Sequence, residues 1–317
     1  MGDKYIVRNI IKVKMNIPIV DTSTERYHNP RKVTSTLSCI IYKATQDEVG
    51  SVIIKKFRND QYFRIYDHVV RETTILQNID HPNIVKLREI WPEPSYPSLI
   101  LEFSGQSLWS YARPLTRKAR AEKFDDIFGQ VLLAIRYLHA NGIIHRDIKA
   151  TNVLILKGVV KLCDFGLARR VTGDEMGSMA YTLNYRAPEV LAGNTDYGSA
   201  ADMWAIGCMM YDFIMRVFLF GKGGEDETDD YMITEILDEV PATIDELEVL
   251  NLEHDIPKGV KWGKLSRLCH YLTDVKINMI KSLLNIVPNN RLSAQECLQI
   301  LNQTPPFSAQ ITPPPFL

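Results

Sequence analysis

Apolar and polar residues alternate along the first third of the chain in a pattern that is typical of β-strands. Residues 40–44 and 51–55 are strand-like, and a polar turn that ends at Gly50 separates them. Residues 95–101 predict a further strand. One helix interrupts the strands and presents apolar side chains that lead toward Asp80. These apolar positions are Val69, Val70, Ile75 and Leu76.

After residue 102 the pattern changes to helical periodicity. Residues 125–140 place five apolar side chains on one face, and Asn141-Gly142 ends the predicted helix. Further helices are expected at residues 200–216, 228–239 and 274–286. A β-rich first third, a helical remainder and a connector between them predict an α+β chain with two lobes, and ligands usually bind between such lobes.

Composition and charge exclude several classes of partner. The 317 residues are 45% hydrophobic and 24% charged, as in an ordinary globular protein, and the net charge is −1. This balance gives no electrostatic reason to bind nucleic acid or an anionic membrane surface. No apolar run approaches the roughly 20 residues that span a bilayer. We therefore predict no nucleic-acid partner and no membrane partner.

The cysteines indicate a reducing compartment. There are five, they are scattered along the chain, and none has C-x-x-C spacing. A disulfide framework or a zinc site is therefore not expected, and the cytoplasm, the nucleus or both fit best.

Residues suited to phosphoryl transfer gather in a few short segments. This chemistry needs a cation on the phosphates, metal ligands, and a carboxylate that orients the attacking hydroxyl. Residues 144–152 hold Asp147, Lys149 and Asn152, which supply a carboxylate, a cation and an amide on one loop. The other segments are Val52-Ile53-Ile54-Lys55, Glu72 on the following helix, Asp164-Phe165-Gly166 and Ala187-Pro188-Glu189.

Taken in their order along the chain, these segments resemble the signature of the eukaryotic protein kinases. The resemblance covers residues 27–307 and implies the bilobal protein kinase fold. Its β-rich N-lobe would comprise residues 27–101, its hinge residues 102–106 and its helical C-lobe residues 107–307. Residues 1–26 would be an N-terminal extension and residues 308–317 a Pro-rich tail.

The resemblance also implies a reaction and its cofactors, namely transfer of the γ-phosphate of ATP, with Mg²⁺, to Ser or Thr of protein substrates. Lys55 would bind the α- and β-phosphates and pair with Glu72, and Asp147 would orient the substrate hydroxyl. Lys149 would lie near the transferring phosphate, and Asn152 and Asp164 would ligate Mg²⁺, which prefers such oxygen ligands. The residues expected to contact the nucleotide are Thr34, Ile41, Ile53, Lys55, Leu101, Glu102, Phe103, Leu154 and Asp164.

Other motifs resemble the cyclin-dependent and mitogen-activated kinases of the CMGC group. They are residues 81–87 (HPNIVKL), residues 164–169 (DFGLAR) and residues 182–189 (TLNYRAPE). The last motif places Arg186 where related kinases create a preference for Pro after the phosphorylated residue. A cyclin-dependent-like kinase with a role in cell-cycle or transcription control is therefore expected, and a mitogen-activated type is the nearest alternative.

Activation by a cyclin-like partner is a further expectation. Residues 70–72 (Val-Arg-Glu) match the end of the cyclin-binding helix signature, but residues 66–69 (Tyr-Asp-His-Val) depart from it. A cyclin-like activator would therefore be an unusual one. We also expect the helix that carries Glu72 to be displaced in the isolated chain, so that activity depends on a partner or on phosphorylation.

The family also implies structural roles for residues outside the reaction. His145 is expected to pack with Phe165, Leu76 and Leu87 across the lobes. Arg291 is expected to pair with Glu189, and Asp202 and Trp204 to anchor the C-lobe.

The chain departs from the family pattern in its phosphate loop. The three glycine positions hold Thr34, Thr36 and Cys39, and Ile53 replaces the alanine that lies over adenine. Glycine allows close backbone approach to phosphates, so ATP binding that is weaker than usual is expected. A pseudokinase that works as a binding or scaffold module is therefore the alternative function.

The activation segment departs from the pattern as well, because it lacks the usual activating threonine. Ser178 is the nearest residue that could be phosphorylated, and a solvated, unmodified loop is the alternative. Arg146 would bind the phosphate, since guanidinium suits bidentate phosphate contacts. Thr182 and Arg186 complete the predicted regulatory set.

Overall fold

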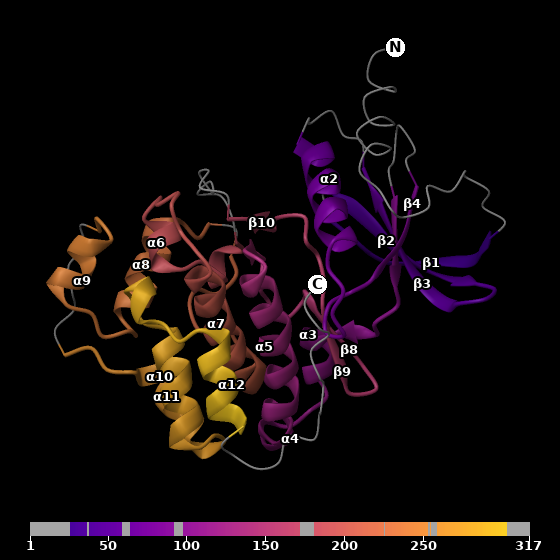
Figure 1. The fold of residues 1–317 in the computed structure, drawn as a ribbon. Coiled ribbons are helices and arrows are strands. Elements are labelled where there is room, and N and C mark those ends of the chain that lie inside the picture. Colours follow the sequence, from indigo (N-terminus) through magenta and orange to yellow (C-terminus); the bar gives the residue numbers. More distant parts are fainter. Residues whose placement is uncertain are drawn as a thin grey trace.

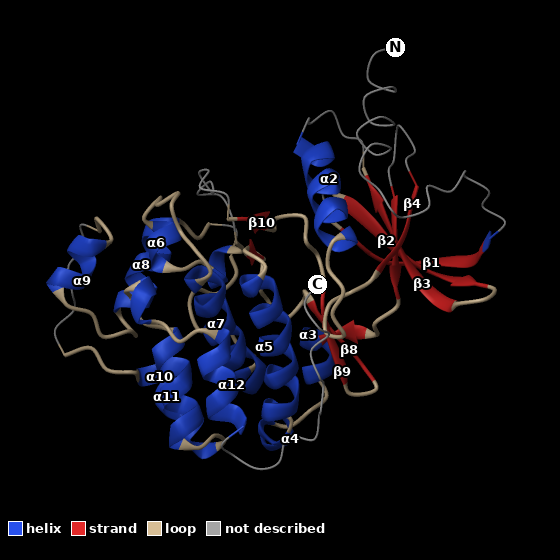
Figure 2. Ribbon diagram, viewed as in Figure 1, coloured by secondary structure: helices blue, strands red, loops and turns tan. Residues whose placement is uncertain are grey.

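The computed structural model describes residues 26–36, 38–58, 64–91, 98–171, 181–224, 226–252, 254 and 259–302. A β-sheet with one long helix forms one lobe, and helices dominate the other (Figures 1 and 2). The predicted α+β arrangement of a β-rich lobe before a helical lobe is confirmed. Most of the predicted N-terminal extension and the whole Pro-rich tail lie outside the described residues.

The N-lobe is built on a five-stranded antiparallel sheet with the order β1-β2-β3-β5-β4. The inner strand β5 is buried along most of its length, whereas the edge strand β1 is exposed after Tyr27. Both predicted strands of the first hairpin are present and extend further than expected. The strands are β1 (Tyr27–Ser35), β2 (Cys39–Gln46), β3 (Gly50–Phe57), β4 (Leu87–Trp91) and β5 (Ser98–Glu102).

Helix α2 (Arg64–Gln77) lies beside this sheet (Figure 1). Its buried side chains include Val69, Ile75 and Leu76, whereas Val70 is 36% exposed. After α2 the chain reaches the C-lobe, where Asn83 donates to the Val160 carbonyl at 2.8 Å. This contact fixes the base of the N-lobe on the C-lobe.

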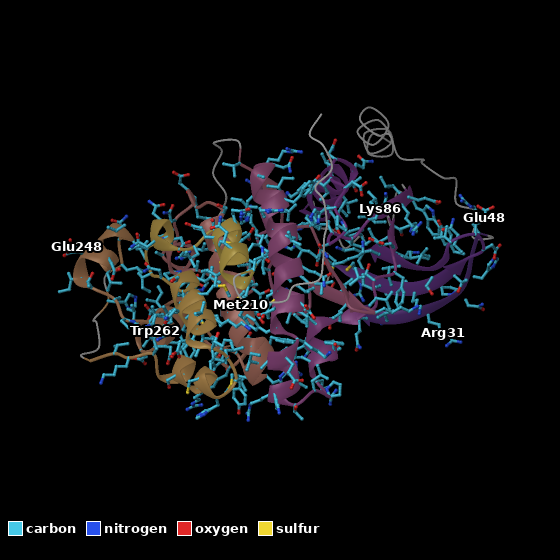
Figure 3. All side chains as sticks on the ribbon, turned by 60° about the horizontal axis from the view of Figure 1, so that its bottom comes forward. Arg31, Glu48, Lys86, Met210, Glu248 and Trp262 are labelled. Atoms are coloured by element: carbon cyan, nitrogen blue, oxygen red, sulfur yellow. The ribbon has the colours of Figure 1, made fainter. Side chains whose placement is uncertain are left out.

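The C-lobe is organised around α5 (Phe124–Ala140) and α7 (Ala200–Met215). Helix α5 begins one residue before its predicted start and ends at its predicted end. Every residue of α7 from Ala201 to Ile214 is buried, so this helix forms the centre of the lobe. Figure 3 places Met210 within the helical lobe, whereas Arg31 and Glu48 lie at the far end of the N-lobe.

The other C-lobe elements surround these two helices or form short strands next to the hinge. The strands are β6 (Gln106–Ser107), β7 (Ile143–Ile144), β8 (Val153–Leu156), β9 (Val159–Leu162) and β10 (Arg169–Arg170). The helices are α3 (Leu108–Ala112), α4 (Arg117–Glu122), α6 (Pro188–Leu191), α8 (Asp229–Leu237), α9 (Ile244–Val249), α10 (Gly263–Ser266), α11 (Asp274–Leu283) and α12 (Ala294–Asn302). The described part of the lobe also contains the 3₁₀ turns η2 (Leu183–Tyr185), η3 (Arg267–His270) and η4 (Pro288–Asn290). None of the helices described is both long and apolar enough to cross a membrane.

The hinge between the lobes is tightly held. Glu102 Oε1 accepts hydrogen bonds from Lys161 Nζ on β9 and from the Lys86 amide before β4, each at 2.7 Å. Gly105 has a φ of +87°, and a β-carbon there would lie 2.1 Å from the Ile155 carbonyl oxygen. Only glycine fits this position, because the hinge backbone passes directly over β8.

Candidate active site

Lys55 on β3 lies between two carboxylates from different parts of the chain. Its ammonium Nζ is 2.7 Å from Glu72 Oε2 on α2 and 2.8 Å from Asp164 Oδ1 after β9. Lys55 is 6% exposed and Glu72 is fully buried. The register of β3 between β2 and β5 aims Lys55 at the lobe interface, where both carboxylates reach it.

The charges of this cluster stabilise one another. Burial alone would lower the pKa of Lys55, but the carboxylates of Asp164 and Glu72 raise it above its usual value. The Lys55 ammonium lowers the pKa of Asp164 to about 2. Burial raises the pKa of Glu72 against the effect of Lys55. At neutral pH a cation and an ionised Asp164 therefore face the same space.

The expectation that α2 is displaced in the isolated chain is wrong. Helix α2 sits against the sheet with the Lys55–Glu72 ion pair formed. Arg71, next to Glu72, donates from Nη1 to the Gly166 carbonyl at 3.0 Å. Two successive residues of α2 thus hold the helix to both lobes, which the sequence pattern alone did not indicate.

The loop after β7 gathers the predicted catalytic groups around Asp147. Thr182 donates its hydroxyl to Asp147 Oδ1 at 2.8 Å, and Lys149 Nζ lies 2.8 Å from Oδ2. Lys149 Nζ also donates to Thr182 Oγ1 at 2.7 Å. Asn152 donates from Nδ2 to Asp147 Oδ2 at 2.7 Å and to the Asp147 carbonyl at 2.9 Å. The carboxylate is therefore held in one orientation from three sides.

The same bonds orient the side-chain oxygen of Asn152, which was predicted as a metal ligand. Because both amide protons of Asn152 go to Asp147, its Oδ1 is turned away from Asp147 and stays available as an oxygen donor. Asp164 is ionised, and its side chain is 45% exposed. Among the described residues, no group of three or more His, Cys, Asp or Glu side chains converges as a metal cage. Two oxygen ligands fit Mg²⁺, which usually binds through few protein groups, phosphates and water.

The predicted packing of His145 against Phe165 is present. Its ring lies edge-on to Phe165 with a centroid separation of 4.8 Å, and Leu76 and Leu87 belong to the same buried cluster. Burial lowers the pKa of His145, so its ring is neutral. The ring accepts from the Asp147 amide at Nδ1 and donates from Nε2 to the Cys163 carbonyl. The packing of His145 thereby supports the catalytic loop.

The glycine-free phosphate loop forms a closed turn. The Thr36 amide donates to the Cys39 carbonyl at 2.8 Å, and the Cys39 amide donates to Thr36 Oγ1 at 3.1 Å. Thr34 lies on β1 opposite Ile41, and no hydrogen bond of its hydroxyl is recorded among the described residues. The Thr36 hydroxyl thus accepts a hydrogen bond from the amide of Cys39, the residue at the third glycine position. The sequence, which showed only that the glycines are missing, did not indicate this bond.

The other predicted nucleotide contacts lie along β2, β3, the hinge and β8. Ile41 and Ile53 are half-buried and pack against the main core, and Leu101 is 6% exposed. Phe103 lies under Lys43, whose Nζ is 3.9 Å from the ring centroid. The Glu102 carboxylate is used by Lys161 and Lys86, so only its backbone can face a nucleotide. Leu154 on β8 is half-buried opposite Lys161.

The predicted regulatory residues separate into different places. Ser178 lies outside the described residues. Arg146 is 6% exposed, and its Nε and Nη1 are buried without hydrogen-bond partners among the described residues. Thr182 belongs to the Asp147 cluster, as described above. Arg186 donates from Nε to the Tyr181 carbonyl at 3.2 Å and pairs with Asp229 at 2.7 Å.

Two residues that sequence reasoning missed belong to this region. Ser104 in the hinge is 3% exposed, and its hydroxyl has no partner among the described residues. Tyr181 is buried beside the catalytic loop with a φ of +67°. The predicted contact set stopped at Phe103, and the sequence pattern assigned no role to Tyr181.

Comparison with known proteins places this geometry in a family. Residues 27–301 match the family described as "Protein kinase domain". The chain is 29% identical over 286 residues to "Cyclin-dependent kinase-like 4" of Mus musculus, covering 88% of this chain and 82% of that protein. It is 31% identical to "Cyclin-dependent kinase F-3" of Oryza sativa subsp. japonica, with 87% and 64% covered. It is 30% identical to "Mitogen-activated protein kinase mpkC" of Emericella nidulans, with 87% and 67% covered.

Proposed function

The chain belongs to the protein kinase family, and from this premise we propose that it transfers the γ-phosphate of ATP to protein Ser or Thr residues that precede Pro. It is a serine/threonine kinase of the cyclin-dependent-like type. The observation that carries the proposal is the complete set of polar contacts around Asp147, together with Lys55 and Asp164 at the lobe interface.

Each of these residues has a place in phosphoryl transfer, which is catalysed mainly by positioning and by charge. Lys55 would bind the α- and β-phosphates. Asp164 and Asn152 would hold Mg²⁺, which neutralises charge on the phosphates when it is bound. Asp147 would accept the proton of the attacking hydroxyl, and Lys149 would stabilise charge on the transferring group.

The preference for Pro rests on the backbone of Tyr181. Its positive φ turns the carbonyl toward Arg186 Nε, which donates to it at 3.2 Å. That carbonyl is therefore not free to accept the N–H of the residue after the phosphorylated one. A residue without an N–H loses nothing at this position, which favours Pro over other residues.

Regulation and location complete the proposal. A phosphate on Ser178 would have as donors Arg146 Nε and Nη1, which have no hydrogen-bond partner within the described part of the chain. A cyclin-like activator would bind at α2 and would stabilise a Lys55–Glu72 pair that the single chain already forms. We place the enzyme in the cytoplasm or the nucleus, in control of the cell cycle or transcription.

A binding or scaffold module without catalysis is the second candidate. The observation that favours it is the closed turn of Thr36 and Cys39, which ties up an amide above the expected phosphate position. Against it stand Lys55, Asp147, Asn152 and Asp164, all of them present and oriented.

A phosphorylation assay decides between these functions. The purified chain is incubated with radiolabelled ATP, Mg²⁺ and a peptide library that contains Ser-Pro and Ser-Ala sequences. We expect incorporation that favours Ser-Pro, and a fall in kcat of at least about 10²-fold in Asp147→Asn. Asp238→Asn, which changes a carboxylate at the end of α8 outside the site, is the control and should behave as wild type. Equal activity of Asp147→Asn and wild type would contradict the assignment, and Mg·ATP binding without any phosphorylation would favour the scaffold.

A further inference from the structure

Tyr181 has a backbone conformation that its own side chain disfavours. Its φ is +67°, in the left-handed region that costs a bulky residue free energy, yet the residue is only 4% exposed. Such a conformation persists only where the surroundings determine it. The hydrogen bonds of Tyr181 therefore show which neighbouring segments fix this conformation.

All three polar groups of Tyr181 are bonded to other segments of the C-lobe. Its amide donates to the Arg146 carbonyl at 3.0 Å, and its carbonyl accepts from Arg186 Nε at 3.2 Å. Its hydroxyl donates to Asp202 Oδ1 at 3.1 Å. One residue thus joins the catalytic loop, the substrate-side segment 181–186 and helix α7.

Asp202 extends this connection into the backbone of the catalytic loop. Its Oδ1 also accepts from the Arg146 amide and its Oδ2 from the His145 amide, each at 2.9 Å, and His139 Nε2 lies 3.0 Å from Oδ2. Burial alone would raise the pKa of Asp202, but the hydrogen bond from His139 and the other donors bring it below its usual value. An ionised carboxylate thus holds the Tyr181 hydroxyl and both loop amides together.

The next residue along the chain carries this arrangement to the reacting groups. Thr182 donates to Asp147 Oδ1 at 2.8 Å and accepts from Lys149 Nζ at 2.7 Å. A shift of Tyr181 would therefore move Thr182 and loosen both Asp147 and Lys149. We propose that Tyr181 is a positioning residue, whose hydroxyl fixes the substrate-side segment to the catalytic loop through Asp202. This inference rests on the proposed kinase function.

The connection does not involve a phosphate. The hydrogen bond of Tyr181 to the catalytic loop is made with the Arg146 carbonyl and does not use the guanidinium, whose Nε and Nη1 have no hydrogen-bond partner among the described residues. The guanidinium of Arg146 lies near the Tyr197 ring, with Cζ 5.7 Å from its centroid. The tie through Tyr181 therefore holds whether or not Arg146 binds a phosphate on the activation segment.

The test removes the hydroxyl alone. Tyr181→Phe keeps the ring and loses one buried hydrogen bond to a carboxylate. Tyr27→Phe is the matched control, because Tyr27 is also buried, at 6% exposed, and donates its hydroxyl to Glu89 Oε2 at 2.7 Å in the N-lobe. Both variants and the wild type are treated with phosphatase. They are assayed for kcat, for KM of ATP and peptide, and for the ratio of kcat/KM on Ser-Pro and Ser-Ala peptides.

We expect Tyr181→Phe to lower kcat by about tenfold, because hydrogen bonds to charged groups are worth roughly one to two powers of ten. The Ser-Pro to Ser-Ala ratio should also fall, with KM for ATP unchanged. Tyr27→Phe should lower the melting temperature about as much as Tyr181→Phe does. It should leave kcat and the Ser-Pro to Ser-Ala ratio as in wild type. A purely structural role of Tyr181 would not move the ratio.

The ratio remains informative for a poorly folded variant, since both peptides are measured with the same active fraction. Wild-type kcat and ratio in Tyr181→Phe would overturn the inference while the kinase function stands. An effect of Tyr181→Phe on kcat that appears before phosphatase treatment and is absent after it would overturn the phosphate-independent tie. A wild type that is inactive both before and after treatment would overturn the kinase function and this inference together.

Discussion

Replacing Thr36 by Gly should tighten ATP binding, because the Cys39 amide now donates its hydrogen bond to the Thr36 hydroxyl and not to a phosphate. That amide donates to Thr36 Oγ1 at 3.1 Å, at a position where related kinases direct backbone N–H groups to the phosphates. Without the hydroxyl the amide becomes free to donate to a phosphate oxygen. The turn itself can persist, since the Thr36 amide still reaches the Cys39 carbonyl at 2.8 Å.

The expected gain follows from two opposing contributions. A hydrogen bond to a charged group contributes about 1.5–3 kcal/mol. The extra freedom of glycine costs about 0.5–1 kcal/mol. The net gain of about 1 kcal/mol corresponds to about fivefold tighter binding. Wild-type affinity should lie near the weak end of the usual range, at roughly 1 mM.

Isothermal titration calorimetry with Mg²⁺ and a non-hydrolysable ATP analogue measures this change. Thr36→Ser retains the hydroxyl and should bind as wild type. Thr34→Gly removes a side chain with no recorded role in closing the turn and should not tighten binding. Micromolar wild-type affinity that Thr36→Gly fails to improve would refute the reasoning, as would equal improvement by Thr34→Gly.

Two further predictions concern stability. Arg291→Lys should cost about 3 kcal/mol and lower the melting temperature by several degrees, because its two guanidinium bonds to Glu189, both of 2.7 Å, are buried. The control is Arg136→Lys, which weakens one exposed bond to Gln295 Oε1 from a half-buried side chain and should cost under about 0.5 kcal/mol. Equal losses in the two variants would contradict this. Burial raises the pKa of Asp212 to about 8, so the folded protein keeps a proton that the unfolded chain releases. The free energy of unfolding should therefore fall as pH rises from about 4 to about 8, and Asp212→Asn should flatten this slope in urea titrations. An unchanged slope would show that Asp212 is ionised in the folded protein.

The sequence predicted those parts of the molecule that depend on local pattern and on motif order. Helix α5 is predicted by its own apolar face and by Asn141-Gly142 after it. Lys55, Glu72 and Asp147 stand in motifs whose order and spacing suffice to find them. The pairing of Arg291 with Glu189 was likewise expected from the motifs and is confirmed at 2.7 Å.

Other features depend on contacts between distant residues and have no local signal. The position of α2 is set by Glu72 and Arg71, and Arg71 binds a carbonyl 95 residues away. Tyr181 reaches Asp202, 21 residues later, and its positive φ follows from the packing there. The sequence shows Thr36 only as a missing glycine, whereas the hydrogen bond that its hydroxyl accepts from the Cys39 amide depends on the folded turn.

The hinge carries a consequence for turnover. Glu102 ends β5, and its Oε1 binds both the Lys86 amide just before the neighbouring strand β4 and Lys161 Nζ on β9 of the other lobe. A rotation that separates the lobes therefore stretches the bond to Lys161. The side chains of Lys161 and Glu102 are 18% and 19% exposed, so dissolved ions reach this pair. Product release that waits for such a rotation becomes slower in dilute buffer and faster at high ionic strength. We expect turnover to rise with ionic strength where lobe opening limits product release, so that an ion pair outside the reaction would affect how often the enzyme can start again.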